Sequence, residues 1–199
     1  GSREGSDPGT IQDIEAKRTM ISKHNAWMET NFFSLSPASS MRDASRTHYY
    51  TACAKMDFML QLRDELHTHS HKEESNAGLR GLAKRPFLAA CRTLRISCSL
   101  REVSMRYTWL FKAYTQWYAL AYILRYLCAF PLTPEKEEAW ELVNQTFSAI
   151  PYAQELPIRG QIVPQNTGRN SIWRCLALLR RQALNAKTSA SSQAQDTAP

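Results

Sequence analysis

The sequence predicts an all-α protein, an irregular bundle of about six helices around one central, buried, aromatic-rich helix at about residues 103–130. The first observation is the run from Tyr107 to Phe130, the longest apolar stretch, which contains neither Gly nor Pro and stops at Pro131. The second is that apolar residues recur at helical spacing on both sides of this run. The third is that only 7 of 199 residues are Gly, fewer than a turn-rich β fold normally needs.

We expect the chain to form one helical domain with a short extension at each end. Residues 1–9 are polar, lack the apolar core of a signal peptide, and are expected to be disordered or to act as a linker. Residues 10–186 carry all of the helical patterns and are enough for one domain with a sizeable core. Residues 187–199 are rich in Ala, Ser, Thr and Gln without an apolar stripe, so we expect a disordered tail.

The first part of the chain predicts two amphipathic helices joined by a loop. One begins at Thr10, a suitable N-cap, and ends near Phe33. Its apolar stripe is Ile11, Ile14, Ile21 and Met28. Residues 34–40 contain Pro37 and small polar residues and are expected to form a loop. The second helix covers about residues 43–66. Its buried stripe is expected to be Ala52, Met56, Met59 and Leu66, widened by Cys53 and Leu60.

A third helix is expected to begin at Pro86, because proline suits the first turn of a helix. Its buried stripe is expected to be Phe87, Leu88, Cys91, Leu94 and Cys98. No Gly or Pro separates it from the central helix, so we expect a kink near residues 99–103 instead of a loop. The central helix carries apolar residues on nearly every side, which is typical of a helix surrounded by other helices.

Two more helices are expected after the central one. Thr133 suits a helix cap, Pro134 a first helical position, and Glu135 the positive end of the helix dipole. The helix that follows is expected to end near residue 150 and to bury Ala139, Trp140, Val143 and Phe147. After a long loop at 151–168, the last helix is expected over residues 171–185. Its inner residues are Ile172, Leu176, Leu179 and Ala183.

The central run is long enough to cross a bilayer, so a membrane span is the alternative to a buried helix. Lys112, Gln116 and Arg125 argue against a span, because a charge near the bilayer centre costs about 2.5 to 3.5 kcal/mol. We therefore expect a core helix and no membrane contact. The net charge of +7 is concentrated at residues 80–106 and 169–187. These segments suit solvated helix faces or, alternatively, contacts with phosphate groups or an acidic protein surface.

The sequence contains no motif that assigns an enzymatic site. Glycine-rich phosphate loops, H-E-x-x-H and G-x-S-x-G are all absent. The five cysteines are an odd number without a C-x-x-C pair, which argues against a disulfide framework or a cysteine zinc site and favours a reducing compartment. His67, His69 and His71 are expected to lie in a polar loop, with metal binding as the alternative. We therefore assign no catalytic, cofactor-binding or metal residue and do not expect an enzyme.

Three segments of the chain resemble a known family. They are WLFKAYTQWYALAYILRYLC at 109–128, EAW at 138–140 and IWRCLALL at 172–179. Their order and gaps resemble the C-terminal part of the regulatory (middle homology) region of fungal binuclear-zinc-cluster transcription factors. The motif residues, also expected in the core, are Trp109, Phe111, Tyr114, Gln116, Trp117, Ala119, Leu127, Cys128, Trp140 and Trp173. Two positions depart from the family pattern: Tyr118 stands where the family usually has His, and Cys175 where it often has Pro.

The resemblance implies a fragment of a regulatory domain that acts in the nucleus through protein partners or other domains of a parent transcription factor. The zinc cluster of that family is missing from this sequence, so the resemblance implies only indirect contact with DNA. A small-molecule effector is compatible with it, without any indication of its identity. The alternative is a helical domain that binds a small molecule in an aromatic pocket formed by Trp109, Tyr114, Trp117 and Tyr122.

Overall fold

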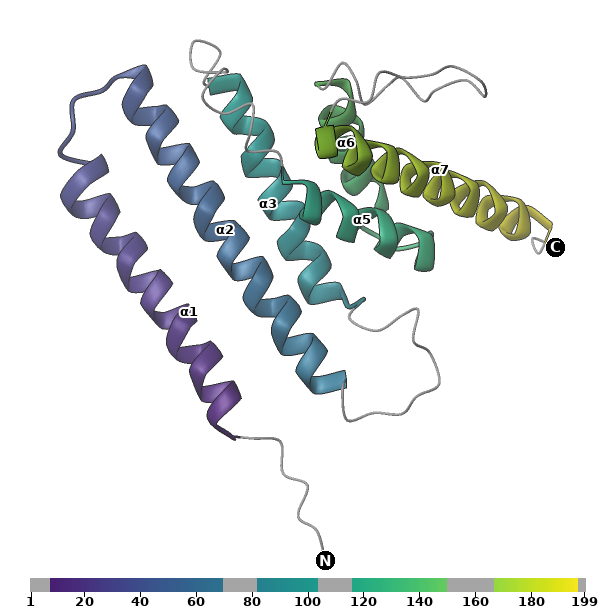
Figure 1. Ribbon diagram of the computed structural model, residues 1–199, viewed down its shortest axis with the longest axis horizontal. Helices are drawn as coiled ribbons and strands as arrows, with labels where there is room; N and C mark the ends of the chain where they lie inside the picture. The colour runs from purple at the N-terminus through teal and green to yellow at the C-terminus, as the bar shows by residue number, and fades with distance from the viewer. Residues whose placement is uncertain (1–7, 70–81, 104–115, 150–166, 197–199) are drawn as a thin grey trace, which may run out of the picture.

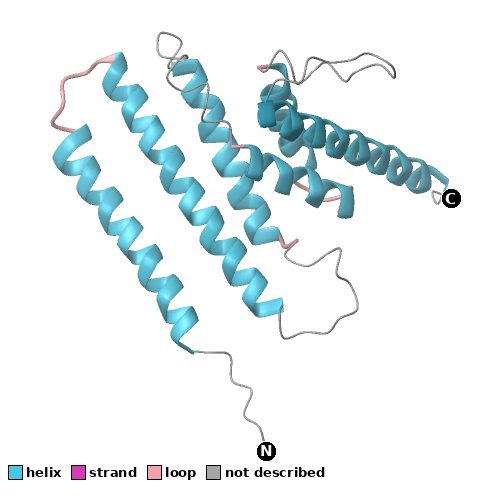
Figure 2. Cartoon of the chain, in the orientation of Figure 1, coloured by secondary structure: helices cyan, strands magenta, loops and turns pink. Residues whose placement is uncertain are grey.

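The computed structural model describes residues 8–69, 82–103, 116–149 and 167–196 (Figure 1; Figure 2). Within these ranges the chain forms α-helices and one π-helical turn, and no strand. The elements are α1 (Pro8–Met28), η1 (Glu29–Phe33), α2 (Ser40–His69), α3 (Lys84–Val103), α5 (Trp117–Ala129), α6 (Lys136–Ser148) and α7 (Thr167–Asp196). The all-α prediction is confirmed.

The helices form two groups that meet at α3 (Figure 1). α1, α2 and α3 lie side by side, with α2 in the middle and successive helices running in opposite directions. α5 and α6 also pack against α3, and α7 packs along α5. α1 continues directly into η1 and packs on α2. The chain therefore has a core built on α3, and α1 forms with α2 a helical hairpin whose second helix packs on α3.

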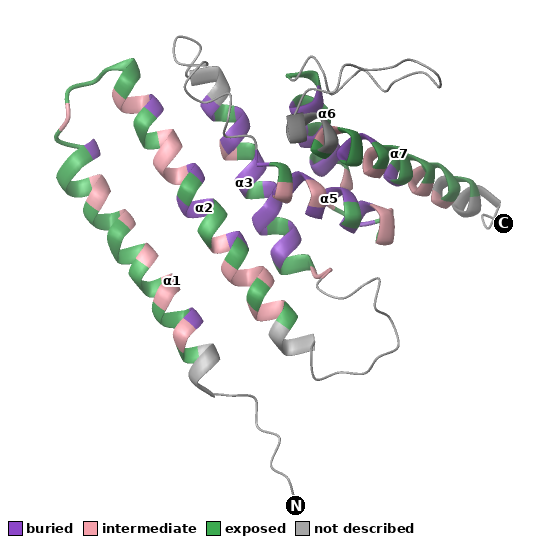
Figure 3. Ribbon diagram, viewed as in Figure 1, coloured by how far each residue is buried: buried purple, intermediate pink, exposed green. Residues whose placement is uncertain are grey.

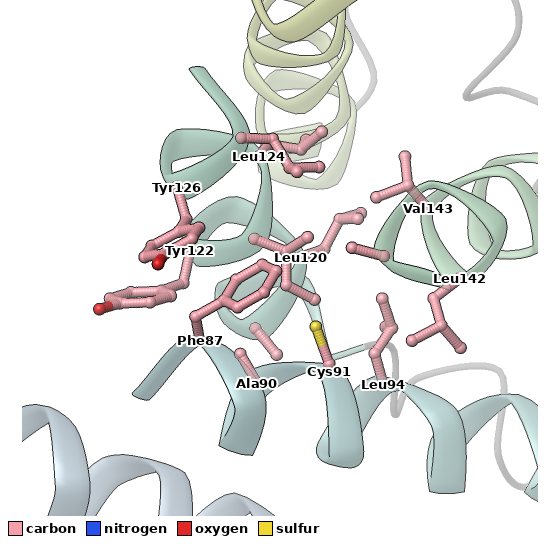
Figure 4. Close-up of a cluster of buried hydrophobic side chains, with 14 of the residues drawn as sticks. Phe87, Ala90, Cys91, Leu94, Leu120, Tyr122, Leu124, Tyr126, Leu142 and Val143 are labelled. Atoms are coloured by element: carbon pink, nitrogen blue, oxygen red, sulfur yellow. The ribbon is translucent and has the colours of Figure 1, made fainter. Parts of the chain in front are cut away.

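The hydrophobic core joins α3, α5, α6 and α7 (Figure 4). Phe87 of α3 is fully buried, and its ring stacks on Tyr126 of α5 with the ring centroids 4.1 Å apart. Phe58 of α2 reaches the same core and packs edge-on against Tyr122, with the centroids 5.5 Å apart. The buried residues of α5 are Ala119, Leu120, Tyr122, Ile123, Leu124, Tyr126 and Leu127. α5 is therefore the central helix of the core, as predicted.

This central helix is shorter than predicted. α5 begins at Trp117 because Gln116 adopts φ −83° and ψ 61°, outside the helical region. The carbonyl of Gln116 accepts the first helical hydrogen bond, from Leu120 N at 3.1 Å. The absence of Gly and Pro permits a helix without requiring one, and aromatic and β-branched residues are modest helix formers. The continuous helix expected at 103–130 is therefore wrong at this point, and residues 104–115 lie outside the described ranges.

The predicted buried stripe of α2 is wrong, although Cys53, which was expected to widen it, is buried. Its four residues are exposed, namely Ala52, Met56, Met59 and Leu66. The residues that are buried in this part of α2 are Thr51, Cys53, Ala54 and Phe58. Because α2 lies between α1 and α3, its covered surface is wide and faces two neighbours. Periodicity locates an apolar stripe on a helix, but the positions of the neighbouring helices decide which stripe is covered.

The start of α6 and the end of α7 also differ from the prediction. α6 begins later than expected, at Lys136, because a turn precedes it. The hydroxyl of Thr133 donates to Glu135 Oε2 at 2.9 Å, and the carbonyl of Thr133 accepts from Lys136 N at 3.1 Å. α7 continues to Asp196, so residues 187–196, expected to be disordered, are helical. No Gly or Pro interrupts them, and their Ala and Gln residues are good helix formers.

Candidate functional site

The structure divides the motif residues between the core, the surface and the segments outside the described ranges. Trp109, Phe111 and Tyr114 lie outside the described residues. Those buried in or beside the core are Gln116, Ala119, Leu127 and Trp140. Cys128 and Trp173 are half-buried against the core, and Trp117 is exposed. The motif therefore marks one part of the core and does not converge on a single cavity.

Trp117 is not a core residue, contrary to the prediction. It is the first residue of α5, it is 46% exposed, and its ring contacts that of Tyr118 at 5.0 Å. Tyr122, expected to share an aromatic pocket with it, is buried against Phe58, and its hydroxyl accepts a hydrogen bond from Ala83 N at 2.9 Å. Burial raises the pKa of Tyr122 to about 12. Neither Trp117 nor Tyr122 lines the pockets described below, so these pockets do not support the predicted aromatic site.

A pocket of about 240 Å³ lies between α1, α2 and α3. α1 contributes Arg18, Ile21, Ser22 and Asn25; α2 contributes Tyr50, Cys53, Ala54 and Asp57; α3 contributes Arg92. On α1 and on α2 these positions follow the spacing i, i+3, i+4 and i+7, so each set shares one helix face. We call this site the arginine pocket.

Both arginines of the arginine pocket retain unused hydrogen-bond donors. Arg18 pairs with Glu15 at 3.8 Å and with Asp64 at 4.0 Å, which is too long for a hydrogen bond. Arg92 is exposed and makes no ion pair or hydrogen bond within the described part of the chain. Asp57 is the one carboxylate among the residues that line the pocket. Two arginines and one aspartate leave the lining with a net charge of +1.

Asn25 is oriented in the arginine pocket by two neighbours on α2. Its Oδ1 accepts a hydrogen bond from the Tyr49 hydroxyl at 2.8 Å and another from Cys53 Sγ at 3.2 Å. Burial raises the pKa of Tyr49 to about 12 and also raises the pKa of the Cys53 thiol, so both remain protonated donors at neutral pH. Because these two bonds occupy the oxygen of the amide, its NH₂ group points the other way as a donor.

A polar cluster beside the pocket fixes η1 to α2. The carboxylate of Glu29 accepts hydrogen bonds from the Tyr50 hydroxyl and from Arg46 Nε, the second at 2.8 Å. The bond from Tyr50 is the main cause that lowers the pKa of Glu29, and burial raises the pKa of Tyr50. Ser34 N donates to Glu29 O at 2.9 Å, five residues earlier, which closes the π-helical turn. The hydroxyl of Tyr50 is therefore already engaged, although Tyr50 lines the arginine pocket.

The α1–α2 hairpin also exposes large apolar side chains. They are Met20 and Trp27 of α1 with Met56, Met59 and Leu66 of α2, and we call them the outer face. Figure 3 shows how little of α1 is buried, in contrast to α3 and α5. The outer face is distinct from the arginine pocket because its residues occupy different positions of the helical period on both helices.

The register of the hairpin places Met20 of α1 and Met56 of α2 at a similar height. Asp13 of α1 pairs with Arg63 of α2 at 4.0 Å. Met20 lies seven residues after Asp13, and Met56 lies seven residues before Arg63, which is about two helical turns in each case. α1 and α2 run in opposite directions. Met20 and Met56 therefore lie at a similar height along the hairpin, on the helix faces that carry Asp13 and Arg63. Met20 is 70% exposed and Met56 is 45% exposed.

A wider groove of about 580 Å³ lies between α6 and α7. Glu137 and Glu141 of α6 are exposed along it. Lys187 Nζ of α7 pairs with Glu137 at 3.6 Å and lies 5.7 Å from the ring centroid of Trp140. Lys187 thus contacts both a carboxylate and an aromatic ring of α6.

Other kinds of site receive no support within the described ranges. No group of three or more His, Cys, Asp or Glu residues gathers there in a way that would hold a metal ion. The side chains of His67, His69 and His71 lie outside the described residues. None of the helices in that part of the chain is both long and apolar enough to cross a bilayer.

Comparison with protein-family models, curated proteins and solved structures gives no match. The arginine pocket and the outer face therefore depend on geometry alone, and sequence reasoning missed both. The positions of Arg18, Ser22 and Asn25 were a signal for the pocket, because they form a polar stripe at helical spacing. No sequence signal joins Arg92 to that stripe, since only the packing of α3 brings it there.

Proposed function

We propose that this chain is a non-enzymatic helical regulatory domain that acts through protein contacts, and that the outer face makes them. The observation that carries the proposal is the exposure of Met20, Trp27 and Met56 on one hairpin. Large apolar side chains gathered on an exposed surface are typical of interaction sites. Methionine is well suited to such a site because its flexible, polarizable side chain adapts to a partner surface.

The outer face fits an amphipathic helix of a partner protein. Two helices that lie side by side offer furrows between their side-chain ridges, and a third helix packs into these with its apolar residues. One end of the outer face carries Asp13 with Lys17 and Arg63, both of which pair with Asp13. This charged end gives a bound helix a preferred direction, because opposite charges attract and like charges repel.

The same proposal places the chain in the regulatory region of a fungal binuclear-zinc-cluster transcription factor, acting in the nucleus. Its support is the motif described above and the helical fold, in which the motif residues Ala119, Leu127 and Trp140 belong to one core cluster. In this role the domain influences DNA binding or transcriptional activation only through other domains or partner proteins.

A reporter assay tests the proposed function. The full chain is fused between a heterologous DNA-binding domain and an activation domain, and reporter expression in a fungal host is compared with that of the same fusion without the chain. We expect the chain to change expression severalfold. Met56→Lys is expected to abolish the change, because a lysine in the middle of the outer face would have to be desolvated on binding.

The matched control is Leu178→Lys on α7, since Leu178 is 44% exposed and lies far from the hairpin in the sequence. This variant is expected to behave like the unmodified chain. Two results would contradict the proposal: no effect of the chain on the reporter, or full regulation by the Met56→Lys fusion.

A further inference from the structure

We infer that the arginine pocket binds a small molecule that carries a carboxylate or phosphate group. The inference is independent of the proposed function, because the pocket and the outer face use different faces of α1 and α2. It depends on which donors the fold brings together, what those donors already bind, and how much room lies between them.

The two arginines provide the positive charge of the site. Arg18 comes from α1 and Arg92 from α3, so the packing of three helices is needed to place them around one cavity. A guanidinium group stays charged at all physiological pH values and presents a planar fork of donors that matches a carboxylate or a phosphate. Within the described part of the chain, Arg18 has only long ion pairs and Arg92 has none.

Neutral donors complete the lining. Asn25 also lines the cavity, and the two hydrogen bonds to its Oδ1 leave its NH₂ group as the donor. Ser22 adds a hydroxyl. The hydroxyl of Tyr50 is bound to Glu29 and is not counted among the donors. The lining is therefore rich in hydrogen-bond donors, and a negatively charged acceptor on a ligand would complement them.

Asp57 determines where in the arginine pocket an anionic group can lie. Its carboxylate is held by Gln61 Nε2 at 2.9 Å and makes no ion pair with either arginine. It repels an anion, so a ligand is expected to place its negative group toward Arg18 and Arg92 and away from Asp57. The volume of about 240 Å³ is below the roughly 300 to 1,000 Å³ of sites for drug-sized ligands, which favours a small metabolite.

Isothermal titration calorimetry of the full chain tests the inference, with inorganic phosphate and succinate as separate probes in a low-salt buffer without other polyvalent anions. We expect at least one probe to bind, and the difference between the two to identify the anionic group. Arg92→Gln and Arg18→Gln are each expected to weaken binding by about tenfold or more, since each removes charge-assisted hydrogen bonds. Asp57→Asn is expected to strengthen binding severalfold, because it removes the opposing charge.

The control is Arg174→Gln on α7, which changes the net charge by the same amount at an exposed position outside the pocket. It is expected to leave affinity unchanged. The inference is overturned if neither probe binds at millimolar concentration, if Arg174→Gln weakens binding as much as Arg92→Gln, or if Asp57→Asn fails to strengthen it. Circular dichroism checks folding. If Arg18→Gln unfolds the chain, the Arg92→Gln and Asp57→Asn variants still test the inference.

Discussion

Phe87 of α3 and Trp117 of α5 show how differently two aromatic side chains contribute to stability. Phe87 is fully buried and stacks on Tyr126. Trp117 stands at the first turn of α5 with nearly half of its surface in water. Because hydrophobic stabilisation follows the apolar area removed from water, the smaller ring contributes more here than the larger one.

We therefore predict that Phe87→Ala lowers the free energy of unfolding by about 3 to 5 kcal/mol, as other large core truncations do. Trp117→Ala is expected to cost only about 1 kcal/mol, the typical value for a single substitution. Chemical denaturation of both variants gives the two numbers. Equal losses in the free energy of unfolding would mean that Trp117 packs in the core after all.

The sequence could not separate these two residues. Both belong to apolar runs without Gly or Pro, and both fit a buried helical pattern. The difference arises from the backbone of Gln116, whose conformation begins a new helix and leaves Trp117 at its end. Helix boundaries of this kind depend on tertiary packing and have a weak sequence signal.

At the scale of single elements, Glu29 connects η1 to α2 through Tyr50 and Arg46. The folded state lowers the pKa of Glu29 below its ordinary value of 4.5, mainly through the hydrogen bond from Tyr50. The stability gained from this group is present above pH 4.5 and is lost as the pH falls through the lowered pKa. The connection between η1 and α2 therefore weakens in acid.

Tyr50→Phe is predicted to move the pKa of Glu29 upward, toward its ordinary value, because it removes the strongest donor to the carboxylate. Nuclear magnetic resonance titration of the Glu29 side-chain carboxyl carbon measures this. Arg46→Gln serves as a comparison and is also expected to move the pKa of Glu29 upward, since it removes both a hydrogen bond and a positive charge from the carboxylate. An unchanged pKa in Tyr50→Phe would show that the hydrogen bond to Tyr50 does not hold η1 in place.

Some elements were predictable from the sequence because their signals are local. α6 follows a Pro-containing turn, and its predicted face, which includes Ala139, Trp140 and Val143, is buried as expected. α2 is correctly predicted as a helix, but the prediction assigns the wrong apolar stripe of α2 to the core. Met56 is apolar and correctly spaced, yet α2 receives neighbours on two other sides, and this arrangement is a property of the whole fold.

At the scale of the whole molecule, the chain combines a well-packed core with a more exposed hairpin. α3 and α5 supply many of the fully buried side chains, including Phe87, Leu94 and Leu120. Among the residues of α1 whose burial is described, Ile14 is the one that is buried. Elements with few buried apolar contacts open at lower free energy than the core. Such a hairpin suits a partner-binding surface, because binding can cover apolar groups that the core leaves in water.

The two candidate surfaces could not be predicted at this scale from the sequence. Arg18, Asn25 and Arg92 each read as residues of a solvated helix face, which is the usual place for polar side chains. Their meeting depends on how three helices pack, and the outer face likewise depends on the absence of a covering helix within the described ranges. The composition of a helix indicates its amphipathic character but not its neighbours.

Hydrogen exchange measured by mass spectrometry on the full chain tests the division between core and hairpin most directly. We predict that the amides of α3 and α5 exchange slowest and together, at the free energy of global unfolding, and that the amides of α1 exchange much faster through local opening. Protection of α1 equal to that of α3 and α5 would contradict the account, because it would place α1 inside the same cooperative core.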